Sequence, residues 1–289
     1  MSTLRAYIDL MKLRVVELLI ITTVPAVVLA EGGFPSLALL TWTLIGGTLA
    51  AGSANAFNMV IESERDKLMK RTSKRPLVTG AVTRTQATIF AIAIGLLSLA
   101  IFYIFTTPLA TLLTAIAIGY YVIIYTIALK PNTSQNIVWG GAAGCMPVLI
   151  GWAAVTNSLT LVPFAFFMVI FFWTPPHFWA LAIKYKDDYS AAGIPMLPSV
   201  ATRANVIGQM WFHTIAMVLC STALIQLAHL PVWTLMATVA LGAVFTFQLF
   251  ALKENSDNYN KVAGGIFHWS ITYLTLLSVL LVVAQLLSA

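Results

Sequence analysis

Apolar residues in this chain gather in long runs, and short polar connectors separate the runs. Nine runs reach the length of a membrane-spanning helix, which needs roughly 20 predominantly apolar residues. They cover residues 14–31, 37–58, 87–106, 109–129, 137–155, 161–183, 205–228, 231–251 and 266–287. The pattern predicts an all-α polytopic membrane protein with nine transmembrane helices in a bundle, forming a single membrane-embedded domain over residues 1–289.

The connectors alternate between two kinds along the chain. Every second connector is short and contains neither Lys nor Arg. All 16 Lys and Arg residues lie in the N-terminal segment and in the other set of connectors, which covers 59–86, 130–136, 184–204 and 252–265. Positive charge concentrates on the cytoplasmic side of membrane proteins. We therefore predict that the N-terminus lies inside and the C-terminus outside the cell membrane.

Composition agrees with this interpretation. The chain is 60% hydrophobic and has a mean hydropathy of +0.90, whereas about 45–50% apolar residues is typical of soluble domains. A net charge of +6 suits a nucleic-acid partner in a soluble protein. Here its one-sided distribution indicates membrane orientation, so we expect the lipid bilayer and no nucleic acid as a partner. Cys145 and Cys220 lie in apolar runs, which favours buried packing over a disulfide.

Inside the second run, oxygen-bearing side chains begin to recur at helical spacing. Asn58, Glu62 and Asp66 are four residues apart, so on a continuing helix they drift by only about 40° per step and share one face. Glu64 points about 200° away from Glu62 on the same helix. Mg²⁺ is commonly held by one or two carboxylates together with substrate phosphates. The spacing favours Asn58, Glu62 and Asp66 as metal-binding and catalytic residues.

Basic residues follow the acidic ones in the same connector. Lys70, Arg71, Lys74 and Arg75 supply positive charge for a phosphate or diphosphate that a metal ion only partly neutralises. Their alternative interpretation is a solvated, positive-inside loop. That alternative does not account for a polar face that begins within the apolar run, at Asn58 and at Asn55.

A second acidic cluster, Asp187 and Asp188, follows the sixth run. Adjacent carboxylates repel each other, so at a membrane boundary they need a cation to offset them. One interpretation pairs Asp188 with Lys184, four residues earlier. The other makes the two clusters a single site that faces the cytoplasm, in which both bind metal ions on a diphosphate.

Two further features belong to the runs themselves. Small residues at Gly46, Gly47 and Ala50 are interpreted as surfaces for close helix packing. Glu17, near the inner end of the first run, either pairs with a basic neighbour or extends to water.

Several segments together resemble a known superfamily. They are Asn58-x-x-x-Glu62-x-x-x-Asp66, continued by Met69-Lys-Arg71-Thr72 and Arg75-Pro76-Leu77, and the segments 136–144, 151–155, 174–182 and 186–198. This set is similar to the UbiA-type intramembrane prenyltransferases and, within them, to the protohaem IX farnesyltransferases (haem O synthases). The resemblance covers the chain to about residue 200, and beyond that only the pattern of spans matches.

The resemblance implies a helical bundle around a central cavity and transfer of a farnesyl group from farnesyl diphosphate to a vinyl group of haem B, giving haem O. Mg²⁺ is the implied cofactor, with Asn58, Glu62 and Asp66 as the first metal motif and Asp187 and Asp188 as the second. The implied diphosphate-binding cations are Lys70, Arg71, Arg75 and Lys130. The chain departs from the superfamily pattern at Glu64, often Asp, and at Lys184, often an acid.

The same resemblance implies an acceptor side. His177 is expected to serve haem, as an axial ligand or by orienting a propionate, and Trp179 to line the acceptor site. A downstream haem-modifying enzyme is a further partner that the resemblance suggests.

Two other functions stay open at this point. One is a prenyltransferase of the same fold that acts on an aromatic quinone precursor, against which the segment around His177 argues. The other is a cation transporter, but transporters usually place ionisable groups near the bilayer midplane, and here the groups gather at one end of the helices.

Overall fold

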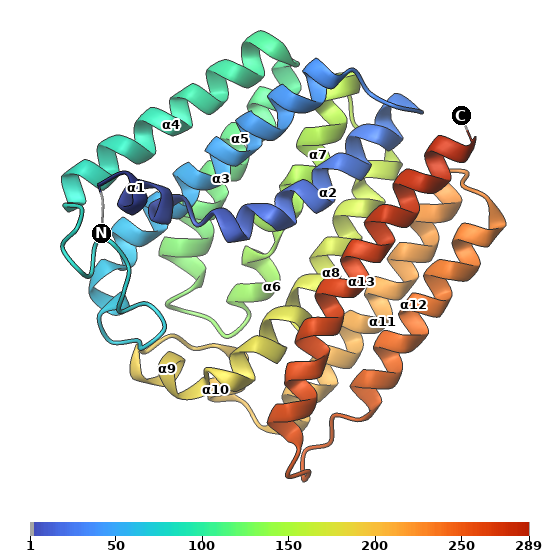
Figure 1. The fold of residues 1–289 in the computed structure, drawn as a ribbon. Coiled ribbons are helices and arrows are strands. Elements are labelled where there is room, and N and C mark those ends of the chain that lie inside the picture. The colour runs from blue at the N-terminus through green and yellow to red at the C-terminus, as the bar shows by residue number, and fades with distance from the viewer. Residues whose placement is uncertain (1–2, 289) are drawn as a thin grey trace.

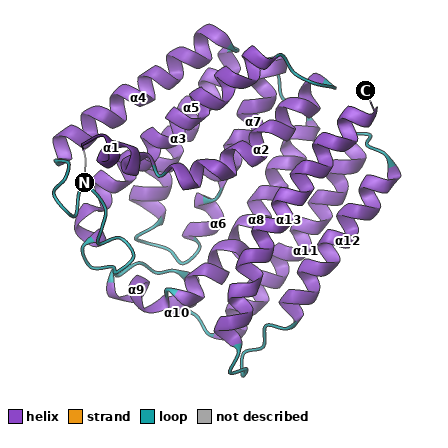
Figure 2. Ribbon diagram, viewed as in Figure 1, coloured by secondary structure: helices purple, strands orange, loops and turns teal. Residues whose placement is uncertain are grey.

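The computed structural model describes residues 3–288, and the side chains of 14–18, including Glu17, lie outside the described residues. Figure 2 shows helices joined by loops, with no strand in the described part of the chain. The helices are α1 (Thr3–Met11), α2 (Leu13–Glu31), α3 (Leu37–Asp66), α4 (Arg84–Phe105), α5 (Pro108–Gly119), η1 (Tyr120–Leu129), α6 (Asn136–Gly140), α7 (Ala142–Thr156), α8 (Leu161–Lys184), α9 (Lys186–Ala191), α10 (Leu197–Val200), α11 (Arg203–Leu227), α12 (Val232–Phe250) and α13 (Tyr259–Ser288).

The all-α membrane architecture predicted from the runs is confirmed. Within the described residues, eight helical segments are long and apolar enough to cross a membrane. The first run contributes a shorter apolar helix over the residues that can be assessed, Leu19–Glu31. The chain is therefore an integral membrane protein, and the count of nine spans stays a prediction.

The helices form one bundle, in which α8, α11, α12 and α13 lie alongside one another (Figure 1). Their inward side chains make the largest apolar core, which includes Phe166, Ile170, Met217 and Leu274. On the other side of the bundle α3 and α4 approach closely at Gly46. The Gly46 carbonyl accepts a 2.7 Å hydrogen bond from the Ser98 hydroxyl, and the missing side chain of Gly46 leaves room for the Phe102 ring. A Cβ at Gly46 would lie 2.8 Å from that ring, so this crossing confirms the predicted packing role of glycine there.

The chain enters the bundle through a short helix that the run pattern did not predict. Helix α1 buries Ala6 and Leu10 against α3 and α4 and exposes Leu4 and Ile8. Lys12 follows it in the left-handed region, with φ of 52°. This turn ends α1 and starts α2 at a new angle, and it brings Lys12 beside the C-terminal half of α3.

The fourth run changes helix type partway along. Residues Pro108–Gly119 are α-helical, and Tyr120–Leu129 form a π-helix of 10 residues. π-Helices are rare and often occur at functional sites. The ring of Tyr125 fits only because residue 140 is Gly, since a Cβ there would overlap the ring.

Two segments that are far apart in the sequence meet at one end of the bundle. The loop of residues 67–83, which follows α3, lies beside α9 (Figure 1). Met69 from this loop is buried in one apolar cluster with Tyr189, Ile194 and Met196. This cluster holds the loop against the region of the second acidic pair.

Candidate active site

The residues that were expected to share one face do so on α3. The helix continues to Asp66, as the spacing required, and the side chains of Asn55, Asn58, Glu62 and Asp66 are all buried, none more than 5% exposed. We call these four residues the α3 polar face. Glu64 points outward and pairs with Lys67 at 2.8 Å, with 70% of its side chain exposed. This outward direction agrees with the angle expected for Glu64 on a continuous helix.

Each carboxylate of the α3 polar face has a cation against it. The ammonium group of Lys130 lies 2.6 Å from the Glu62 carboxylate. Asp66 Oδ2 accepts a 2.5 Å hydrogen bond from Nη1 of Arg75, and the Asp66 carbonyl accepts one from Thr72. Burial lowers the pKa of Lys130, and the neighbouring Glu62 carboxylate opposes that effect. The structure thus joins four predicted site residues in two buried ion pairs.

Asn58 has two polar partners from other elements. Its Oδ1 accepts a 3.0 Å hydrogen bond from the Lys12 ammonium, and its Nδ2 donates one of 3.3 Å to the hydroxyl of Thr126. The pKa of Lys12 lies well below its ordinary value, chiefly because of burial and then because of the charges of Arg75 and Lys130. Three cations therefore converge on this end of α3.

The second acidic cluster contacts the loop that follows α3. Helix α8 ends at Lys184 and α9 begins at Lys186, so Lys184 and Asp188 do not share a continuous helix. Asp188 Oδ2 instead accepts a 3.4 Å hydrogen bond from the backbone N–H of Arg71. The Arg71 guanidinium lies 5.9 Å from the ring centres of both Tyr185 and Tyr189. Lys70 and Asp187, the sequence neighbours of Arg71 and Asp188, are exposed.

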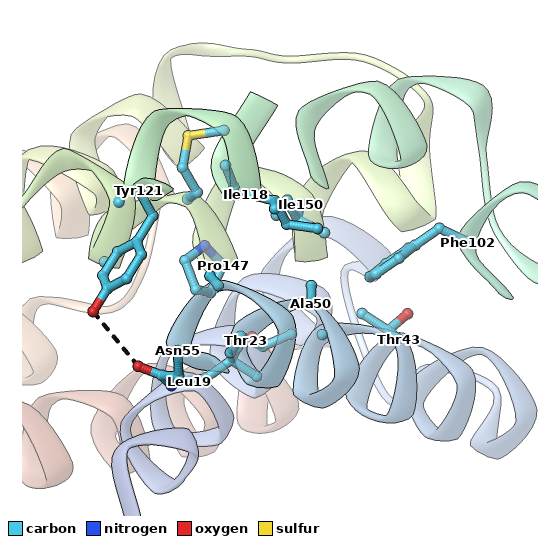
Figure 3. A pocket seen from close by; sticks show the side chains of 17 residues that line it. Leu19, Thr23, Thr43, Ala50, Asn55, Phe102, Ile118, Tyr121, Pro147 and Ile150 are labelled. Atoms are coloured by element: carbon cyan, nitrogen blue, oxygen red, sulfur yellow. Dashed lines mark hydrogen bonds between the residues drawn. The ribbon is translucent and has the colours of Figure 1, made fainter. Parts of the chain in front are cut away.

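An apolar cavity of about 160 Å³ leads to the α3 polar face. It runs along α3 from Thr43 to Asn55, a length of about 18 Å at 1.5 Å per residue, between α2, α4, α5 and α7. Small side chains of α3 form its wall: Gly47, Ala50, Ala51 and Ala54. Gly47 and Ala50, which we interpreted as packing surfaces, therefore line a cavity. At its polar end the hydroxyl of Tyr121 donates to Asn55 Oδ1 at 3.5 Å (Figure 3).

His177 and Trp179 lie elsewhere in the bundle. The His177 ring is buried between α8 and α13, stacked on Trp173 and Phe267, with Nδ1 2.7 Å from the hydroxyl of Ser270. Trp179 is fully buried and packs edge-on against His213. Neither residue lines the cavity. Within the described residues, the structure does not bring them into contact with the α3 polar face.

The donor set of the α3 polar face fits a magnesium ion that completes its coordination with substrate oxygens and water. Glu62, Asp66 and Asn58 offer hard oxygen atoms, and both carboxylates are buried with a cation against them, Lys130 at Glu62 and Arg75 at Asp66. No group of three or more His, Cys, Asp or Glu side chains gathers closely enough to hold a metal among the described residues. The α3 polar face has two carboxylates, and Mg²⁺ usually takes one or two from the protein.

Sequence reasoning did not single out two residues that contact the α3 polar face, Lys12 and Thr126. Lys12 looked like one more positive-inside charge. Thr126 lies in a continuous apolar run, and only the π-helical register places it opposite Asn58.

Comparisons of the whole chain give a consistent result. Residues 19–284 match the model of the UbiA prenyltransferase family. The chain is 50% identical over 282 residues to a protein of Renibacterium salmoninarum named protoheme IX farnesyltransferase, covering 96% of this chain and 89% of the relative. It is 49% identical over 283 residues to a protein of the same name from Frankia alni, covering 98% of each chain.

Solved structures share the fold at low sequence identity. A UbiA homologue from Aeropyrum pernix superposes with a TM-score of 0.72 at 17% identity, over 95% of this chain and 98% of that one. A UbiA homologue from Archaeoglobus fulgidus, bound to GPP and Mg²⁺, gives 0.69 at 17% identity, over 96% and 99%.

Proposed function

The chain belongs to the UbiA prenyltransferase family, within which it groups with the protohaem IX farnesyltransferases, and from this premise we propose that it transfers a farnesyl group from farnesyl diphosphate to a vinyl group of haem B. The products are haem O and diphosphate. We further propose that residues 1–289 act as one membrane-embedded catalytic domain.

The observation that carries this proposal is the junction of an apolar cavity with a buried, charged end of α3. The cavity walls are almost entirely apolar, which suits an isoprenoid tail. The two buried ion pairs, Glu62 with Lys130 and Asp66 with Arg75, begin two turns beyond the Asn55 end of the cavity. A prenyl diphosphate has this same order of parts, because an apolar chain ends in a charged headgroup.

The two ion pairs suit an exchange of partners when the substrate binds. Glu62, Asp66 and Asn58 would hold Mg²⁺, and Lys130 and Arg75 would turn to the diphosphate oxygens. Bound Mg²⁺ supplies Lewis-acid stabilisation of the leaving diphosphate. Asp187 and Asp188 lie on the loop side of the headgroup, where they would act as the second metal motif, and Arg71 and Lys70 would bind the outer phosphate. In this exchange each carboxylate would gain Mg²⁺ as its partner, and each basic side chain would gain the diphosphate, so no buried charge is left unpaired.

The bond changes follow from this arrangement. The allylic C–O bond of farnesyl diphosphate breaks, and its electron pair leaves with the diphosphate. The vinyl group of haem B attacks the electron-poor farnesyl carbon, which leaves positive charge on the vinyl carbon next to the porphyrin ring. One water molecule adds at that carbon and releases a proton, which gives the hydroxyl that haem O carries. The faces of Tyr121 and Tyr125 stabilise positive charge near the cavity. The apolar walls limit access of other water.

His177 and Trp179 are proposed to serve the acceptor from the neighbouring face of α8. The His177 ring is held by Ser270 and by two aromatic rings, so a role in ligating or orienting haem requires that this packing open on the cytoplasmic side. We propose that the protein lies in the cell membrane with the N-terminus and the α3 polar face inside and the C-terminus outside. A downstream haem-modifying enzyme is the proposed recipient of the product.

The test is a reaction with purified protein, haem B, farnesyl diphosphate and Mg²⁺, read by mass spectrometry. Formation of haem O supports the proposal. If haem B is inert and an aromatic acid is prenylated, the acceptor assignment is wrong. If no diphosphate is released and the protein moves cations across liposomes, the enzyme assignment itself is wrong.

A further inference from the structure

Asn58 can present either its oxygen or its NH₂ group to the site, because the two ends of an amide have nearly the same shape. Only the oxygen can bind a metal ion. Something must therefore select one of the two orientations, and the hydrogen bonds around Asn58 show which groups do so.

Two groups distinguish the ends of the amide: the Lys12 ammonium, which can only donate, faces Oδ1 in the place proposed for the metal, and Thr126 faces Nδ2. The Thr126 hydroxyl donates a 2.9 Å hydrogen bond to the carbonyl of Tyr121. A hydroxyl has one proton, so towards Asn58 it can only accept. The neighbouring atom must be the donor Nδ2, found 3.3 Å away. Oδ1 then points to the other side, where Lys12 occupies it in this structure.

The π-helix makes this hydrogen bond possible. In an α-helix, a threonine hydroxyl that bonds its own helix reaches the carbonyl four residues back. In η1 the Thr126 hydroxyl instead reaches the carbonyl five residues back, that of Tyr121. The backbone N–H of Lys130 likewise donates to the carbonyl five residues back, that of Tyr125. On a regular α-helix Thr126 would lie about 140° around the axis from Tyr121. In η1 both residues contact α3, at Asn58 and Asn55.

We infer that Thr126, in the register set by the π-helix, is a positioning residue that fixes the Asn58 amide with its oxygen towards the metal site. The inference rests on the proposed function, because it takes Asn58 as a metal ligand. Lys12 holds the oxygen in the absence of the metal. Losing the Thr126 hydroxyl lets the amide rotate and present N–H groups, which repel a cation.

The experiment compares Thr126→Val, which removes the hydroxyl at nearly constant shape, with Thr126→Ser, which keeps it. Thr114→Val is the matched control. Thr114 is also buried and its hydroxyl bonds a carbonyl of its own helix segment, four residues back. The readout without turnover is the Mg²⁺ concentration that half-saturates thermal stabilisation in the presence of inorganic diphosphate. Activity against Mg²⁺ concentration is the second readout.

We expect Thr126→Val to raise the half-saturating Mg²⁺ concentration by roughly two- to twelvefold, the effect of one hydrogen bond. Thr126→Ser and Thr114→Val should keep the wild-type value. A carboxylate has two equivalent oxygens, so in an Asn58→Asp background the change to Val should have no further effect. If Val does not fold, Thr126→Cys replaces the hydroxyl with a thiol of similar volume, which is a weaker acceptor for Asn58 Nδ2, and it should also raise the half-saturating Mg²⁺ concentration.

An unchanged Mg²⁺ requirement in Thr126→Val, or the same increase in the Asn58→Asp background, overturns the positioning role. If the wild-type protein shows no stabilisation by Mg²⁺ with diphosphate, the proposed metal role fails instead. The two failures are distinguished by the wild-type response alone.

Discussion

Replacing Lys130 by Met tests whether the Glu62 pair holds the place of a ligand. The change removes the cation but keeps an unbranched side chain of similar length, so it leaves the Glu62 carboxylate buried and unpaired. Glu62 has 3% of its side chain exposed and Lys130 has 14%. Removing one partner of a buried ion pair costs about 3–5 kcal/mol. The partial exposure of Lys130 places the expected loss near the lower end.

A loss of about 3 kcal/mol lowers the melting temperature by roughly 6–12 °C for a chain of this size. Mg²⁺ with inorganic diphosphate should return part of this loss, because the cation takes the place that Lys130 leaves. The stabilisation by Mg²⁺ should therefore be larger in Lys130→Met than in the wild type. Thermal unfolding in detergent, with and without Mg²⁺ and diphosphate, measures both quantities.

The matched control is Lys67→Met, which breaks the exposed pair with Glu64. Exposed pairs contribute about 0–1 kcal/mol, so its melting temperature should change little. The double variant Lys130→Met with Glu62→Gln should recover stability, since no unpaired charge remains. The reasoning is refuted if Lys130→Met has the same melting temperature as Lys67→Met. It is also refuted if the double variant has a melting temperature as low as that of Lys130→Met alone.

Three further substitutions test individual side chains. Asp66→Ala should lower the rate of diphosphate release from farnesyl diphosphate at least about a hundredfold. The control Glu64→Ala should keep this rate within about twofold of the wild type. Full turnover by a correctly inserted Asp66→Ala protein contradicts the metal role of Asp66. His177→Ala should change the absorbance spectrum of bound haem B and lower the rate, so an unchanged spectrum and rate removes His177 from the acceptor site. Lys12→Met should raise the KM for farnesyl diphosphate roughly tenfold or more, as expected for a lost charged hydrogen bond, and an unchanged KM means that Lys12 serves only Asn58.

The α3 polar face could be predicted because its spacing belongs to one helix. Asn58, Glu62 and Asp66 recur every four residues, and the burial of all three follows from that period. The exposure of Glu64 follows from the same geometry. Hydrophobic and polar periodicity is the primary structural signal in a sequence, and here it identified the buried polar face of α3.

The contacts of that face with Lys130, Lys12 and Thr126 could not be predicted, because these residues come from distant segments. Lys130 is 68 residues from Glu62, and Lys12 is 46 residues from Asn58. The contact of Thr126 depends on the π-helix, and the apolar run of Tyr120–Leu129 has no residue that marks a change from α to π. The cavity was missed for a related reason, since small residues that pack a helix and small residues that line a space look alike in a sequence.

The contact between Arg71 and Asp188 also has a consequence for biosynthesis. These residues are 117 positions apart, so at about 5–20 residues per second the acidic end of α3 leaves the ribosome roughly 6–25 s before α9 exists. During that interval Asp66 already has Arg75, only nine residues away, as a partner. The local ion pair thus shields a buried carboxylate while the nascent chain is still incomplete. A protein interrupted before residue 188 would carry paired charges at the end of α3 but no closed headgroup site.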